Sequence, residues 1–156
     1  MEPLPSFISE PDADYPGWHG WALRDTTRYN AFLGKMLVRL ADDGKAWTRM
    51  FPQTRHSNLS DAVHGGTLTG FIDISLFAAA RLFGMLDPGP AVTLDLSFQF
   101  VGGGRIDQPL DCEIELLRET GRLLFLRGLA RQGDHIIASF GGTIRKPSVR
   151  KPFPLR

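Results

Sequence analysis

Residues 65–86 read GGTLTGFIDISLFAAARLFGML, and this stretch decides the fold of the chain. Asp73 and Arg81 are its only charged residues. The stretch is too long for a strand, and a helix that is apolar on nearly every side must be buried on most of them. It therefore predicts one long buried helix, of the kind around which a sheet is wrapped.

Two short apolar runs that precede this helix predict a β-hairpin. They cover residues 36–41 and 46–51, and residues 42–45 (DDGK) join them with the Asp-Gly pair that is typical of tight hairpins. Before them, residues 29–34 predict a short helical turn that Gly34 closes, because glycine is common just past the end of a helix.

Four runs after the helix predict further strands. Residues 91–100 alternate apolar and polar side chains strictly, which is the period-two pattern of a half-buried strand. Residues 110–115 alternate in the same way, and residues 122–132 and 135–145 are two further apolar-rich runs. We expect a meander of antiparallel strands. The fold is then α+β, with an antiparallel sheet of about six strands and no alternating βαβ units.

The length and composition are those of one globular domain. The chain has 156 residues, of which 42% are hydrophobic and 22% are charged. We expect residues 29–146 to form the domain and residues 147–156 to form a solvated tail. Residues 1–28 show no clear periodicity and predict an irregular arm that packs through Trp18 and Trp21.

The charge balance and the single cysteine exclude several classes of function. Eighteen Lys and Arg against 17 Asp and Glu give a net charge of +1, which provides no field for binding nucleic acid. The start of the chain resembles no secretory signal, and no apolar stretch is long enough to span a membrane. Cys112 has no second cysteine for a disulfide or a zinc cluster. We expect a cytoplasmic protein without membrane contact.

The start of the helix is a candidate site for stabilising negative charge. The segment His64-Gly65-Gly66 opens it, and its two glycines let a ligand approach the backbone closely. The first amides of a helix have no partner within it, so they stabilise a carbonyl oxygen that becomes an oxyanion. Asp73 lies too far along the helix to be a cap. Its carboxylate is either satisfied by a neighbouring side chain or is a candidate general base or nucleophile.

Together these residues resemble the signature of the hotdog-fold acyl-CoA thioesterases of the phenylacetate-degradation type. Asn58 stands six positions before His64 of the His-Gly-Gly motif, and Asp73 stands nine positions after it. The resemblance covers residues 29–146. It implies the hotdog fold and an acyl-CoA substrate without any further cofactor. It also implies a homodimer, with homotetramers in part of the family, whose active sites lie at the subunit interface.

The resemblance also implies a role for each motif residue. Gly65 would donate its backbone N–H to the thioester carbonyl oxygen, and Asp73 of the other subunit would act as general base or nucleophile. Asn58 would position water or the thioester. His64 would orient the loop or assist the leaving group.

Further residues are candidates for contacts with water or substrate. Thr93 would help to hold the water, but it shares a strand face with polar residues and fails in this role if that face looks to solvent. Gly66 belongs to the helix entrance. Leu68, Phe71, Phe77 and Phe98 are candidates for the acyl pocket or simply for the core. Arg105 is a candidate for the CoA phosphates or a solvated surface charge.

Alternative functions stay open. A hotdog domain can bind acyl-CoA without hydrolysing it, although binding alone would not need the carboxylate of Asp73. Asp14 and His19 match the Asp-x-x-x-x-His spacing of hotdog enoyl-CoA hydratases, but the Asn-Pro between them is missing. His56 and His64 do not make a complete set of metal ligands, so we expect no metal.

Overall fold

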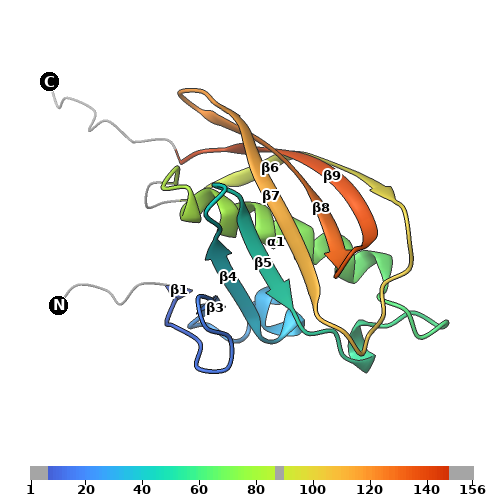
Figure 1. The fold of residues 1–156 in the computed structure, drawn as a ribbon. Coiled ribbons are helices and arrows are strands. Elements are labelled where there is room, and N and C mark those ends of the chain that lie inside the picture. The colour runs from blue at the N-terminus through green and yellow to red at the C-terminus, as the bar shows by residue number, and fades with distance from the viewer. Residues whose placement is uncertain (1–6, 87–89, 148–156) are drawn as a thin grey trace, which may run out of the picture.

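Helix α1 (Gly65–Leu82) runs along the inner face of a curved, seven-stranded antiparallel sheet (Figure 1). The computed structural model describes residues 7–86 and 90–147. The strand order in the sheet is β2-β4-β5-β7-β8-β9-β6. The predicted α+β fold, with an antiparallel sheet wrapped around one long helix, is confirmed.

The strands and short helices follow in chain order. The sheet contains β2 (His19–Gly20), β4 (Met36–Leu40), β5 (Ala46–Met50), β6 (Val92–Phe100), β7 (Leu110–Glu119), β8 (Leu123–Gln132) and β9 (His135–Arg145). A separate pair of two-residue strands is formed by β1 (Phe7–Ile8) and β3 (Ala22–Leu23). The two 3₁₀ helices are η1 (Tyr29–Leu33) and η2 (Thr54–His56). The hairpin β4–β5 and the helical turn before Gly34 are as predicted.

The core lies between α1 and the inner face of the sheet. Three large side chains of α1 are completely buried there, namely Phe71, Ile72 and Leu76. Each such side chain stabilises the fold by about 1.5–3 kcal/mol through burial. Cys112 of β7 is also buried in this layer, and burial raises the pKa of its thiol far above the ordinary range. This cysteine is therefore part of the core.

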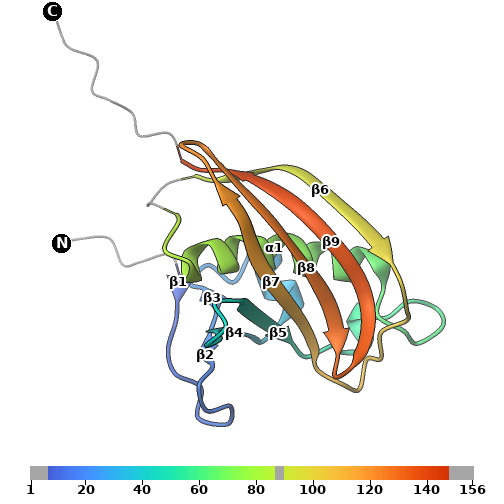
Figure 2. The same ribbon diagram turned by 45° about the horizontal axis from the view of Figure 1, so that its top comes forward.

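Strand β6 does not lie where a simple meander would place it. Strands β7, β8 and β9 are sequential neighbours, but β6 pairs with β9 at the far edge, and β7 pairs with β5 (Figure 2). The chain therefore crosses from one edge of the sheet to its middle between β6 and β7. The predicted meander is wrong at this point, because alternation marks a strand and carries no information about its neighbour.

Helix α1 ends about one turn before the predicted end. Gly84 has a φ of 69°, and its N–H donates to the carbonyl of Arg81. The N–H of Met85 donates to the carbonyl of Ala80, so the two bonds form a Schellman motif that ends the helix. Residues 87–89, which follow the predicted helix, lie outside the described residues, as do residues 148–156 of the predicted tail. Within the described ranges, no helix combines the length and apolarity needed to cross a membrane.

The N-terminal arm is more regular than predicted and is built into the fold. Its strand β2 extends the sheet by pairing with β4. The prediction that the arm packs through Trp18 and Trp21 is confirmed, since both are buried. The indole of Trp18 lies 4.6 Å from the guanidinium carbons of Arg39 and of Arg49. The ring of Trp21 packs against Phe7 at 4.7 Å. The arm thereby covers an edge that would otherwise be open to other chains.

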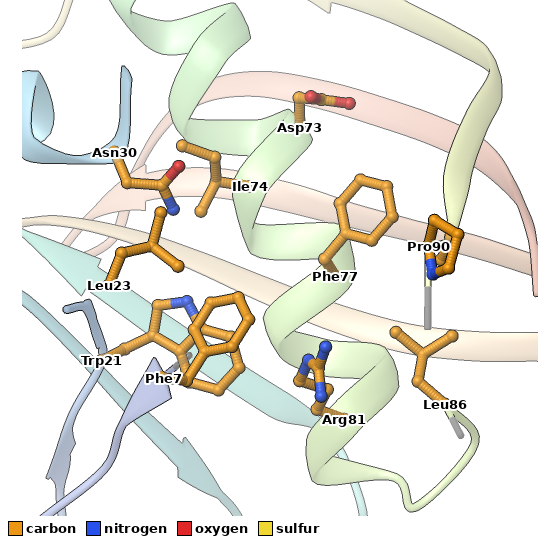
Figure 3. Close-up of a pocket in the computed structure, with 11 residues that line it drawn as sticks. Phe7, Trp21, Leu23, Asn30, Asp73, Ile74, Phe77, Arg81, Leu86 and Pro90 are labelled. Atoms are coloured by element: carbon orange, nitrogen blue, oxygen red, sulfur yellow. The ribbon is translucent and has the colours of Figure 1, made fainter. Parts of the chain in front are cut away.

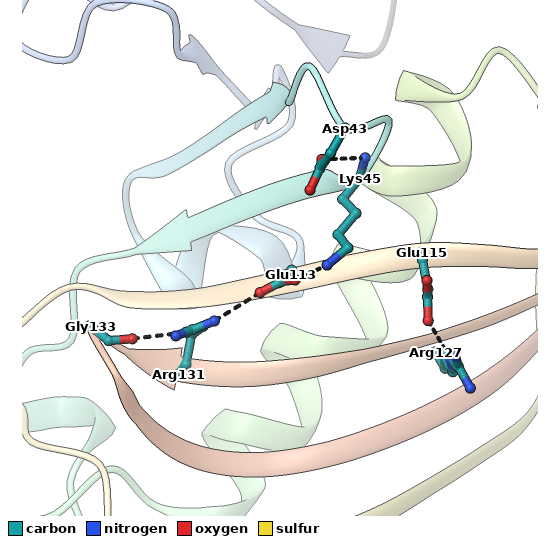
Figure 4. Close-up of polar contacts among 7 residues, drawn as sticks. All are labelled: Asp43, Lys45, Glu113, Glu115, Arg127, Arg131 and Gly133. Carbon is teal, nitrogen blue, oxygen red and sulfur yellow. Dashed lines mark hydrogen bonds and ion pairs between the residues drawn. The ribbon is translucent and has the colours of Figure 1, made fainter.

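The outer face of the sheet carries paired charges (Figure 4). Glu113 of β7 accepts hydrogen bonds from Lys45 and Arg131, and these two cations hold the pKa of Glu113 below its ordinary value. Arg127 donates to Glu115 in the same way. These pairs lie at the surface, with Glu113 itself half-buried, and surface pairs contribute about 0–1 kcal/mol each. This part of the outer face is therefore a solvated surface with balanced charge.

We expect the substitution Gly128→Ala to destabilise the sheet. A Cβ at Gly128 would collide with the carbonyl oxygen of Glu113 and with the ring of Phe140. Overpacking of this kind lowers the free energy of unfolding by about 1–3 kcal/mol. The variant should therefore unfold at a lower urea concentration than wild type, measured at the same protein concentration. The control is Gly121→Ala, where a Cβ has no neighbour within 4 Å. Equal midpoints for the two variants would contradict this packing.

Candidate functional site

Helix α1 leaves one stripe of its surface outside the core. The exposed and half-exposed positions recur every three or four residues, which places them on one side of the helix. The stripe consists of Gly66, Thr69, Gly70, Asp73, Ile74, Phe77 and Arg81. Both charged side chains of α1 therefore lie on the same side of it.

A cavity of about 360 Å³ borders the C-terminal half of this stripe (Figure 3). Its lining side chains are mostly apolar and come from α1, from the arm, from η1 and from the approach to β6. They are Phe7, Trp21, Leu23, Asn30, Asp73, Ile74, Phe77, Arg81, Leu86, Pro90 and Ala91. Asp73 is the only acidic side chain among these lining residues. A cavity of this size and character is suited to a small-molecule group.

Thr93 holds the carboxylate of Asp73. Its Oγ1 donates a hydrogen bond of 2.7 Å to Oδ1 of Asp73. This contact depends on a β-bulge, because the pairing of β6 with β9 shifts register between Thr93 and Asp95. In a strand that alternates strictly, Thr93 and Asp95 would lie on the same face. Leu94 is left out of the pairing with β9, so Thr93 lies opposite the buried Ile144 and faces α1. The structure thus brings two predicted site residues together.

The start of α1 presents an unpaired backbone donor. His64 is the N-cap residue, and its Nδ1 accepts a hydrogen bond of 2.8 Å from the N–H of Gly66. The N–H of Gly65 has no acceptor among the described residues. A Cβ placed on Gly65 would lie 3.7 Å from the ring of Phe100, so this donor sits beside the end of β6.

Asn58 shapes the loop that leads into α1. Its Oδ1 accepts hydrogen bonds from the N–H groups of Ser60 (2.9 Å) and Ala62 (3.1 Å), which is an Asx-type turn. The side-chain nitrogen of Asn58 has no partner in the described part of the chain. Only this nitrogen is therefore available for water or a substrate.

His56 is a structural residue of the same loop. It is completely buried, and its Nδ1 accepts from the N–H of Gln53. Its Nε2 is therefore protonated and donates to the carbonyl of Phe32 at 2.7 Å. In residues 7–86 and 90–147, no group of three His, Cys, Asp or Glu side chains is placed to hold a metal ion.

The structure separates the candidates for substrate contacts into core and cavity residues. Leu68 and Phe71 are 2% and 0% exposed, because their side of α1 faces the sheet, so neither can contact a ligand in the cavity. Phe77, another of these candidates, lines the cavity. The guanidinium of Arg105 is held by two hydrogen bonds to Asp107, which keep the pKa of that carboxyl below its ordinary value. Arg105 would have to leave this partner to bind a phosphate.

Three cavity residues with polar side-chain groups are absent from the predicted site, namely Trp21, Asn30 and Arg81. The signal for Arg81 was its position as the second charge in an apolar helix. Trp21 was visible only as an aromatic residue in a polar arm. Its Nε1 is buried and has no acceptor among the described residues. Asn30 gave no signal, since nothing in the arm is periodic.

Within one chain, Gly65 and Asp73 are too far apart to act on the same carbonyl group. They are eight residues apart on α1, which corresponds to about 12 Å along the helix axis. An oxyanion donor and a general base must each lie within about 3 Å of the reacting atoms. These two residues can therefore share a reaction only if a second chain contributes one of them.

Comparisons with known proteins agree with this fold. Residues 61–138, half of the chain, match the thioesterase superfamily. No curated protein sequence matches the chain.

Similar solved structures cover most of both chains. The TT0310 protein of Thermus thermophilus is 25% identical over 80% of this chain and 99% of its own, with a TM-score of 0.63. The PaaI protein from the phenylacetic acid degradation operon of Escherichia coli is 17% identical over 80% and 86%, with a TM-score of 0.66. A hypothetical thioesterase of Streptococcus pneumoniae, solved with coenzyme A, is 18% identical over 74% and 93%, with a TM-score of 0.63. The chain belongs to the thioesterase superfamily and has the hotdog fold.

Proposed function

We propose that the protein hydrolyses an acyl-CoA thioester to the free acid and CoA. The observation that carries the proposal is the carboxylate of Asp73, held by Thr93 at the border of a mostly apolar cavity. Membership of the thioesterase superfamily supports the reaction. The S. pneumoniae relative that was solved with coenzyme A supports a CoA ester as the substrate.

The proposed active site is completed by a second copy of the chain, paired through β6. This strand is a free edge of the sheet, and its side chains Leu94 and Phe100 are 54% and 59% exposed. An edge strand has unpaired backbone N–H and C=O groups, so an apolar edge of this kind is suited to pairing with a strand of another chain. A homodimer formed in this way follows the ordinary two-fold symmetry of protein oligomers, and two dimers would make the homotetramer.

The geometry of that pairing explains how the site is shared. Two copies of β6 can pair antiparallel about a two-fold axis that passes between Leu96 and Ser97. In this pairing, Thr93 of one copy lies opposite the partner's Phe100. Thr93 holds Asp73, and Phe100 lies beside Gly65 within its own chain. Asp73 of one subunit and the partner's Gly65 would therefore meet at the interface, and each dimer would have two such sites.

The proposed reaction uses these groups as follows. The N–H of Gly65 stabilises the oxyanion that forms when water adds to the thioester carbonyl carbon. Asp73 takes the proton of that water as general base, the C–S bond breaks, and the proton passes to the CoA sulfur. As a nucleophile, Asp73 would instead form an anhydride that water then cleaves. Asn58 positions water or the thioester through its free nitrogen. His64 orients the start of α1.

The alternative functions have less support from the geometry. Asp14 and His19 are exposed in the arm, and neither lines the cavity with Asp73, so they do not form a hydratase site. A protein that only binds acyl-CoA would have no use for a carboxylate oriented by Thr93. The substitutions below separate this alternative from the enzyme.

We expect Asp73→Asn to lower the rate of thioester hydrolysis by about 10² to 10⁴-fold, because the variant loses the general base. Release of free thiol from a panel of acyl-CoA esters measures the rate. Asp42→Asn, an exposed change in the β4–β5 turn, serves as the control and should leave the rate unchanged. If wild type and Asp73→Asn bind CoA esters but are equally slow on all of them, the protein is a binding protein.

A second test removes one backbone N–H. Gly65 is the first helical residue after the N-cap, a position that accepts proline, and His64 has the extended backbone (ψ 137°) that proline requires before it. We expect Gly65→Pro to lower kcat by about 10² to 10³-fold through loss of the oxyanion donor. Gly65→Ala keeps the N–H and adds a Cβ at ordinary contact distance, so it should stay close to wild type. Similar rates for the proline and alanine variants would exclude this donor.

A mixing experiment tests whether the site is shared between subunits. Co-expression of Asp73→Asn chains with Gly65→Pro chains should yield dimers in which one of the two sites has both native groups. With random pairing, about a quarter of the wild-type activity should return, because half of the dimers are mixed and half of their sites are intact. If both groups act within one chain, every site lacks one of them and no activity returns.

A further inference from the structure

The two charged residues of α1 line the same cavity (Figure 3). Asp73 and Arg81 are eight residues apart on the exposed stripe, about 12 Å along the helix axis. Ile74 and Phe77 line the cavity between them with apolar surface. The cavity thus has a carboxylate toward one end of its helical wall and a guanidinium toward the other.

The guanidinium of Arg81 is available for an anion. It lies over the ring of Phe7, 4.7 Å from the ring centre, and has no acidic partner among the described residues. By contrast, Arg49, Arg127 and Arg131 are each paired with a carboxylate. A guanidinium can bind both oxygens of a carboxylate at once, which makes it a specific receptor for that group.

Two further side chains with hydrogen-bond donors line the cavity. Trp21 packs against Phe7, and the guanidinium of Arg81 lies over the ring of the same Phe7. The Nε1 of Trp21 is buried without an acceptor in the described residues, and a buried donor left unpaired costs about 1–3 kcal/mol. The side chain of Asn30 lines the cavity beside Ile74, toward its Asp73 end, and has no partner within the described ranges (Figure 3). The donors at the Arg81 end are therefore the guanidinium and the indole of Trp21.

We propose that the acyl group of the substrate ends in a carboxylate, which Arg81 binds while the thioester carbonyl lies at Asp73. The substrate class is then the CoA monothioester of a dicarboxylic acid. This inference rests on the proposed function, because it places the reacting carbonyl at Asp73. The cation at the far end would favour carboxylated acyl chains, because a neutral chain makes no ion pair with Arg81.

The test compares pairs of CoA esters with equal numbers of acyl carbons. Succinyl-, glutaryl-, adipyl- and suberyl-CoA are set against butyryl-, pentanoyl-, hexanoyl- and octanoyl-CoA. We expect wild type to favour at least one carboxylated ester over its neutral match by about tenfold or more in kcat/KM. Arg81→Met keeps a side chain of similar length over Phe7 but loses the charge. It should abolish this preference, mainly by raising KM for the carboxylated esters. The kcat/KM for the neutral esters should stay within about twofold of wild type.

Matched variants show whether the effect is specific. Arg81→Lys keeps the charge without the planar fork and should retain part of the preference. Arg118→Met removes an exposed arginine near the end of β7, outside the cavity lining, and should change nothing. If wild type shows no preference within any pair, or if Arg81→Met slows both members of a pair equally, Arg81 does not recognise a carboxylate.

A binding measurement separates this inference from the proposed function. Calorimetric titration of the Asp73→Asn protein with the same pairs, with and without Arg81→Met, reports recognition without turnover. Hydrolysis that depends on Asp73 but shows no carboxylate preference overturns the inference alone. Binding that depends on Arg81, without hydrolysis of any ester by wild type, overturns the proposed function and leaves recognition standing.

Discussion

The packing of α1 against the inner face of the sheet is the constraint on which the rest of the structure depends. A helix with only two charged residues can be stable in water only if most of its surface is covered, and the curved sheet covers it. One stripe stays outside the core, and both charges must lie there. The position of the candidate site thus follows from the same burial that stabilises the domain.

The sequence predicted the parts of the fold that depend on local pattern. The apolar stretch, the Asp-Gly turn and the alternating runs each mark one element through its own side chains. The position of β6 beyond β9 depends on which strand completes the sheet, and this is a contact between distant residues. The end of α1 depends on Gly84, whose left-handed backbone ends the helix before the proline-containing segment that follows.

The candidate site was predicted less completely, for physical reasons that differ between residues. Asp73 was visible because a carboxylate is costly in an apolar helix. The sequence left open whether Leu68 and Phe71 belong to the pocket or to the core, because this depends on the rotation of the helix against the sheet, which composition alone does not determine. Trp21 and Asn30 reach the cavity from an arm without periodicity. Only the path of the chain could place them beside the helix.

The bulge in β6 has a consequence for how this chain can change in evolution. Leu94 is largely exposed, so many side chains would fit its place. Because Leu94 is left out of the pairing with β9, Thr93 lies opposite Ile144 and faces Asp73. Deletion of Leu94 would remove the bulge but keep Thr93 on this face, since Thr93 would then directly precede Asp95 in a regular strand. Pairing of Leu94 with β9 would instead turn Thr93 to the opposite face and leave the carboxylate without its donor. Selection should therefore act on the register of β6 against β9 far more than on the presence or identity of Leu94.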